Sequence, residues 1–82
     1  MKIPKKVKVG AKIFKVKIVE QLEKDYIGLT IHSDLTIKIK RGKQRAMEEA
    51  FCHELFHTFH GNLGEDLVCS LGQTLHNFII DN

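Results

Sequence analysis

The sequence has few cysteines, no long apolar run and no lysine or arginine after residue 45. Its two cysteines, Cys52 and Cys69, are too few for the disulfide framework of a small secreted domain. No segment approaches the roughly 18 apolar residues of a membrane-spanning helix. The basic N-terminus is not followed by the apolar stretch of a signal peptide. We therefore expect a cytoplasmic protein without a membrane partner.

The short chain and the shortage of cysteines limit the sources of stability. The 82 residues are enough for a single domain, 1–82, with a thin core. In a reducing compartment we expect Cys52 and Cys69 to be small buried hydrophobic residues, the alternative being a contact between them with a redox or metal-binding role. A bound metal ion could therefore contribute to folding as well as to chemistry.

Basic residues are confined to the first part of the chain. Residues 1–45 carry all 13 Lys and Arg and four acidic residues, a net charge of +9, whereas residues 46–82 carry six acidic residues and none that is basic, a net charge of −6. Such asymmetry can indicate a nucleic-acid partner, but few aromatic residues accompany the basic ones. A basic sheet that binds nucleic acid is thus a weak alternative, built on Lys8, Lys12, Lys15, Lys17, Lys38 and Lys40.

The first half of the chain has the pattern of β-strands. Apolar and polar residues alternate from Val7 to Ile18, with an interruption near Gly10 that predicts a hairpin turn. A second pair of strands is expected over 26–32 and 35–40, with a turn at Ser33-Asp34 between them. We therefore predict a small antiparallel sheet of about four strands, in which one face is rich in lysine.

Helical spacing replaces the alternation after Arg41-Gly42. One helix is predicted from about Lys43 to His60, and a second from about Glu65 to Ile80. A helical wheel places two sets of side chains on opposite sides of the first helix: Phe51, Leu55, Thr58 and Phe59 on one, and Ala50, His53, His57 and His60 on the other. The predicted class is α+β, with the sheet followed by the two helices.

The first predicted helix contains the run His53-Glu54-Leu55-Phe56-His57. Residues four apart stand one turn above each other on a helix, so the two imidazoles can bind the same ion. Glu54, between them, can hold and deprotonate a metal-bound water, whose pKa zinc lowers to about 7. The spacing therefore predicts a zinc site with His53 and His57 as ligands and Glu54 as general base, against the alternative of ordinary histidines on a helix surface.

A catalytic zinc site usually has a third protein ligand. Glu65 is the favoured candidate, because it lies at the border of the apolar stripe of the last helix and can reach a cleft between packed helices. Asp66 lies nearly opposite that stripe, and both acidic residues could instead stabilise the helix N-terminus. His60 shares a face with the other histidines but would lie about 4.5 Å beyond His57 along a continuous helix. His76 could stabilise an oxyanion, although a surface histidine is favoured.

The stretch from Ala50 to His57, followed by Glu65-Asp-Leu-Val68, resembles the zincin metallopeptidases, especially the gluzincins. The order of sheet, motif helix and ligand helix is similar to that of small HExxH proteins of phages and mobile elements, including the ImmA/IrrE type. The resemblance implies a zinc-dependent peptidase acting on a protein or peptide, such as a regulatory protein of a mobile element. The loop before Glu65 is short for a gluzincin, and Tyr26, His60 and His76 all remain candidates for the oxyanion donor.

Two further expectations follow from the resemblance. In zincins an edge strand pairs with extended substrate, and the segment 35–40, directly before the motif helix, is expected to be that strand. A chain this small lacks the extra subdomain that usually walls the substrate cleft. The alternative to an enzyme is therefore a zincin fold that binds a partner without turnover.

Overall fold

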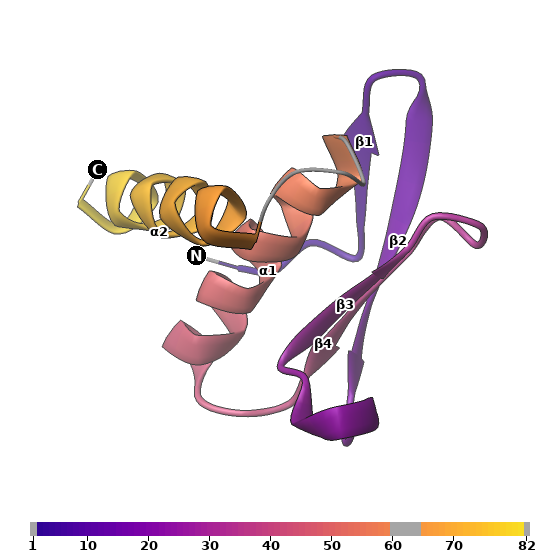
Figure 1. Cartoon of the computed structure of the whole chain (residues 1–82), viewed down its shortest axis with the longest axis horizontal. Helices are drawn as coiled ribbons and strands as arrows, with labels where there is room; N and C mark the ends of the chain where they lie inside the picture. The colour runs from indigo at the N-terminus through magenta and orange to yellow at the C-terminus, as the bar shows by residue number, and fades with distance from the viewer. Residues whose placement is uncertain (1, 60–64, 82) are drawn as a thin grey trace.

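The computed structural model describes residues 2–59 and 65–81 and confirms the predicted α+β class. A four-stranded sheet is followed by two helices (Figure 1). The elements in chain order are β1 (Lys6–Val9), β2 (Lys12–Val19), the 3-10 helix η1 (Glu23–Asp25), β3 (Gly28–Ile31), β4 (Thr36–Lys40), α1 (Gln44–Phe59) and α2 (Glu65–Asp81). In the part of the chain that the structure describes, no helix has the length and apolar character needed to cross a membrane.

Both predicted hairpins form, but the sheet is mixed rather than antiparallel. β1 pairs with β2 through a turn at Gly10, whose φ of 60° suits glycine, and β3 pairs with β4. The second hairpin joins the first through β4, which pairs with β2. These two strands run parallel, with Lys15 opposite Thr36. Alternation identifies the faces of a strand and not its neighbours, which is why the sequence did not reveal this pairing.

The strand order β1-β2-β4-β3 corrects the expectation for a substrate-binding strand. β4, within the predicted segment 35–40, is central in the sheet, and Ile37 and Ile39 are completely buried. Leu35, at the start of that segment, belongs to the preceding turn, with a φ of 49°. A central strand has no free main-chain edge for a substrate, so this expectation was wrong. β3 is the edge strand next to β4.

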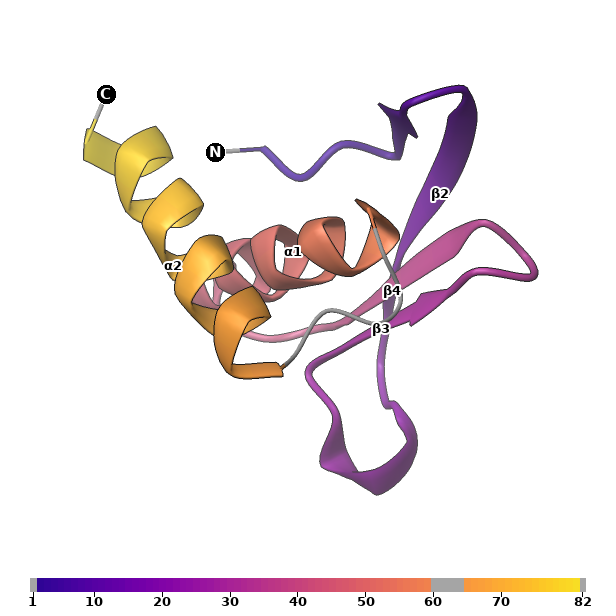
Figure 2. The same ribbon diagram turned by 45° about the horizontal axis from the view of Figure 1, so that its top comes forward.

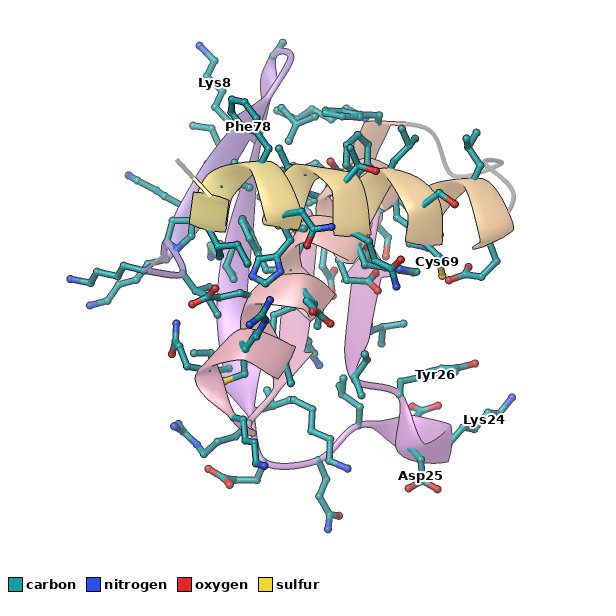
Figure 3. The ribbon with its side chains drawn as sticks, turned by 90° about the vertical axis from the view of Figure 1, so that its left-hand side faces the viewer. Lys8, Lys24, Asp25, Tyr26, Cys69 and Phe78 are labelled. Carbon is teal, nitrogen blue, oxygen red and sulfur yellow. The ribbon has the colours of Figure 1, made fainter. Side chains whose placement is uncertain are left out.

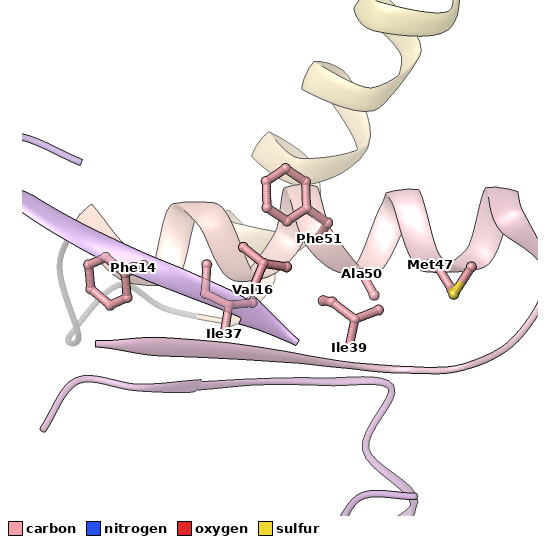
Figure 4. Packing of buried hydrophobic residues seen from close by; sticks show 7 residues of the cluster. All are labelled: Phe14, Val16, Ile37, Ile39, Met47, Ala50 and Phe51. Atoms are coloured by element: carbon pink, nitrogen blue, oxygen red, sulfur yellow. The ribbon is translucent and has the colours of Figure 1, made fainter. Parts of the chain in front are cut away.

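α1 lies between the sheet and α2 (Figures 1 and 2). The core cluster is formed by side chains of β2 and β4 packed against α1 (Figure 4): Phe14, Val16, Ile37, Ile39, Met47, Ala50 and Phe51. The cluster thus takes residues from both sides of the helical wheel, Phe51 from one and Ala50 from the other, while Phe59 is 58% exposed. The reason is that α1 is covered on two flanks, by the sheet and by α2, and such a helix has no single apolar face.

Candidate metal centre

His53 and His57 lie one turn apart on α1, as their spacing predicts. Their Nε2 atoms are 3.2 Å apart, and the side chains are 21% and 19% exposed. Each imidazole is thus largely held by the fold while part of it remains accessible. Two histidines in this arrangement can bind one metal ion.

Glu65, the first residue of α2, reaches both histidines. Its Oε1 lies 2.6 Å from Nε2 of His53, and its Oε2 lies 3.3 Å from Nε2 of His57. The three side chains predicted as ligands therefore converge on one point. His60 lies outside the described residues, and so does the side chain of Asp66.

Gly72 allows α2 to pass close to the histidines of α1. A Cβ atom at this position would lie 2.9 Å from the Cα atom of His53 and 3.0 Å from its backbone nitrogen. Real Cβ atoms do not approach backbone so closely, so the crossing requires glycine. Sequence reasoning did not assign this role to Gly72, although a glycine inside an otherwise helical pattern often marks a close approach.

Glu54 is held by two residues of β3. Thr30 Oγ1 donates a hydrogen bond to Oε1 of Glu54 at 2.7 Å and lies 3.2 Å from the backbone carbonyl oxygen of Glu54. A Cβ atom at Gly28 would lie 2.8 Å from Cγ of Glu54, so glycine leaves room for this side chain. The other carboxylate oxygen, Oε2, is 4.0 Å from Nε2 of His53. Glu54 is thereby positioned beside the point where the ligands converge.

Two hollows open at this site, with volumes of about 310 and 540 Å³. Both are lined by Tyr26, Gly28, Glu54 and Glu65. The smaller also includes His53 and Cys69, and the larger includes His57 and Thr30. Tyr26 follows η1 and is 44% exposed (Figure 3). The predicted general base and ligands therefore border space that can admit another molecule, and Tyr26 is on its wall.

His76 is not part of this site and is not a surface histidine. It is completely buried, and its Nε2 donates a hydrogen bond to Oε1 of Glu48 at 2.8 Å. This hydrogen bond, with a second from Gln44, lowers the pKa of Glu48 from 4.5 to about 2. The pair joins α2 to α1, and neither residue lines the hollows. His76 was expected at the surface because neither its buried position nor its partner is visible in local spacing.

The two cysteines differ from each other. Cys52 is completely buried, as expected, and burial raises the pKa of its thiol. Cys69, also expected to be buried, is exposed, and both cysteines are free thiols. The ligand atoms of His53, Glu65 and Cys69 lie within 4.8 Å of one another. Cys69 is four residues after Glu65, a spacing that sequence reasoning overlooked.

The geometry suits a small divalent metal ion. Tetrahedral zinc, with bonds of about 2.0–2.1 Å, keeps its nitrogen and oxygen ligands about 3.3–3.4 Å apart. The separations of 3.2 Å between the histidines and 3.3 Å between His57 and Glu65 agree with this value. The 2.6 Å between His53 and Glu65 is shorter, and rotation of the exposed Glu65 side chain can lengthen it. These His, Glu and Cys groups could therefore hold a metal ion.

Comparisons of the chain with protein-family models, with curated proteins and with solved structures found no match.

Proposed function

We propose that this protein is a zinc-dependent peptidase whose ion is held by His53, His57 and Glu65. The observation that carries the proposal is the convergence of these three side chains next to the carboxylate of Glu54, at hollows open to another molecule. Two imidazoles and a carboxylate are a donor set typical of catalytic zinc. The similarity to the zincins, noted on the same residues, supports the same reaction.

Each residue of the site has a separate task. A zinc ion at this position would supply a Lewis acid that polarises a peptide carbonyl and acidifies water. Glu54 would take the proton from the attacking water and pass it to the leaving amine, a role that requires its carboxylate to face the hollow. Thr30 would keep that carboxylate in place through its hydrogen bond. Tyr26, on the wall of both hollows, could donate a hydrogen bond to the carbonyl oxygen of the substrate.

β3 offers a way to bind an extended peptide. It is at the edge of the sheet, and Gly28 lines both hollows while Leu29 and Thr30 line the larger. A peptide added to this edge would form main-chain hydrogen bonds and would pass in front of Glu54. We infer that the substrate is a flexible segment of a protein or a peptide, because a folded segment could not pair with the strand.

The test compares Glu54→Gln with the original protein, both loaded with zinc, on an unfolded protein substrate such as casein. Glutamine has the shape of glutamate but cannot accept the proton, so we expect cleavage to fall about 10²–10⁴-fold with unchanged zinc content. Glu23→Gln, the same change in the exposed η1, is the control and should retain activity. Zinc binding without any cleavage by the original protein would contradict the peptidase and would favour a metal-containing binding module.

A further inference from the structure

α2 presents a second potential ligand to the metal centre. Cys69 follows Glu65 by four residues, so both side chains project from the same face of the helix. Figure 3 shows Cys69 on the side of α2 that faces α1, with Phe78 on the opposite side. His53 and His57 have the same spacing on α1. Two helices that cross closely at Gly72 thus each direct a pair of donor side chains towards one region.

The distances place Cys69 beside two of the three proposed ligands, His53 and Glu65. Zinc with bonds of about 2.3 Å to sulfur and about 2.05 Å to nitrogen or oxygen places these atoms about 3.6 Å apart. The sulfur of Cys69 lies within 4.8 Å of the ligand atoms of His53 and Glu65. The remaining difference is at most about 1.2 Å, which rotation of exposed side chains can provide. A thiolate is also a strong zinc ligand, and the thiol releases its proton to the medium when it coordinates the ion.

We propose that Cys69 Sγ is a fourth protein ligand of the metal centre, so that the ion is held by two histidines, one carboxylate and one thiolate. This inference rests on the proposed zinc site. Four protein ligands complete a tetrahedral site, which is then closed to water. Glu54 faces the centre, and a bound peptide that displaced the thiolate would open the site to the water on which Glu54 acts, so the zinc-loaded protein would still cleave its substrate. Binding or release of Cys69 would therefore determine whether water can reach the ion. Cys69 is exposed in the smaller hollow, so a substrate or a thiol reagent can reach it.

Cobalt(II) substitution tests this directly. Cobalt replaces zinc in tetrahedral sites, and a thiolate ligand produces an intense near-ultraviolet charge-transfer absorption that histidine and carboxylate ligands do not. The original protein and two variants, Cys69→Ser and Cys52→Ala, are each titrated with cobalt, and visible absorption reports binding independently of the thiolate. Cys52 is the matched control, because it is the other cysteine and is completely buried.

We expect one cobalt per chain, with a charge-transfer absorption that is retained in Cys52→Ala and lost in Cys69→Ser. Zinc affinity should fall by about tenfold or more in Cys69→Ser, as competition with a chromophoric chelator would measure. Cobalt bound without the charge-transfer absorption would overturn the role of Cys69 and leave the three-ligand centre intact. An absorption that survived in Cys69→Ser would also overturn it. No bound cobalt in any protein would overturn the metal centre itself, and with it this inference.

Alkylation provides a second measurement that does not depend on cobalt. Iodoacetamide should modify the exposed Cys69 in metal-free protein and leave the buried Cys52 unmodified. Coordination occupies the sulfur, so saturating zinc should slow modification of Cys69 by about tenfold or more. The His53→Ala variant lacks an essential ligand and should show no protection. Equal modification rates with and without bound zinc in the original protein would contradict the proposal.

Discussion

Thr30 contributes a single hydroxyl to the candidate site. Its hydrogen bond to Glu54 Oε1, at 2.7 Å, comes from the edge strand and meets a carboxylate that is almost completely buried. A hydrogen bond to a charged group contributes about 1.5–3 kcal/mol. That amount is enough to decide between two orientations of the Glu54 side chain. We therefore regard Thr30 as a positioning residue for the general base.

Replacing Thr30 with valine removes the hydroxyl and preserves the shape of the side chain. We expect kcat to fall by about 10–100-fold, the equivalent of the lost hydrogen bond. Zinc content should be unchanged, because Thr30 is not among the side chains that converge as ligands. KM should also be unchanged, because a peptide added to β3 would bind its main chain, which valine leaves intact. Steady-state kinetics and metal analysis on the same preparations check this.

The matched control for Thr30 is Thr74→Val, the same change at an exposed position of α2. It should leave kcat unchanged. Loss of zinc in Thr30→Val, or an equal loss of activity in the control, would show that the effect is structural and not one of positioning.

Spacing within a helix predicted which candidate side chains would lie close together. His53 and His57 are adjacent on any helix, and Glu65 was selected by its position on the next one. Thr30 and Gly28 were missed because their role depends on how a strand packs against a helix, which no local pattern records. Cys69 was missed for a different reason: its spacing from Glu65 was visible, but a cysteine in a helix was expected to be buried, and Cys69 is exposed.

Where α1 and α2 cross, Glu65 of α2 meets His53 and His57 of α1. Gly72 determines how closely the two helices approach. In Gly72→Ala the new methyl group would overlap the backbone at His53, and overpacking of this kind costs about 1–3 kcal/mol. Alanine in place of a helical glycine stabilises by about 1 kcal/mol. The overlap is the larger effect, so we expect a net loss of about 1 kcal/mol in the free energy of unfolding.

Displacement of α2 should also weaken zinc binding in Gly72→Ala, by about tenfold or more, because Glu65 moves with the helix. Urea unfolding of the metal-free protein and a chelator competition measure the two effects separately. Gly42→Ala is the control, since a Cβ atom there meets open space. A Gly72→Ala protein with unchanged stability and unchanged zinc affinity would mean that the helices do not cross in this way.

The individual elements were predictable from periodicity, and their neighbours were not. Alternation located both hairpins, and the switch to helical spacing located α1 to within one residue at each end. β2 and β4 are parallel because the β3–β4 hairpin pairs with β2 through β4 and not through β3. Which of the two strands pairs with β2 depends on how the whole sheet packs against α1. In the resulting strand order β4 is central, and β1 and β3 are the edge strands.

At the scale of the whole molecule, the buried pair of Glu48 and His76 joins α2 to the rest of the protein. The pKa of Glu48 is about 2 in the folded protein and 4.5 ordinarily. A carboxyl group with a lowered pKa stabilises the fold fully above its unfolded pKa. This contribution is lost as the pH falls from about 4.5 towards 2, because protons then bind preferentially to the unfolded chain.

We therefore expect Glu48→Gln to lower the unfolding temperature at neutral pH and to reduce its decline between about pH 4.5 and pH 2. Thermal unfolding followed by circular dichroism, in the presence of a chelator, would measure both. Glu23→Gln, at an exposed site, should follow the original protein throughout. Parallel curves for Glu48→Gln and the original protein across this range would contradict the assignment.

α2 packs on α1, and none of its described residues belongs to the core cluster formed by α1 and the sheet. An element held by one neighbour can open as a separate cooperative unit, at a lower free energy than global unfolding. Such an opening would carry Glu65 and Cys69 away from His53 and His57 while the sheet stayed intact. The rate at which an ion enters or leaves would then be governed by this local equilibrium, and the lifetime of the bound ion would be a property of the helix contact as much as of the ligands.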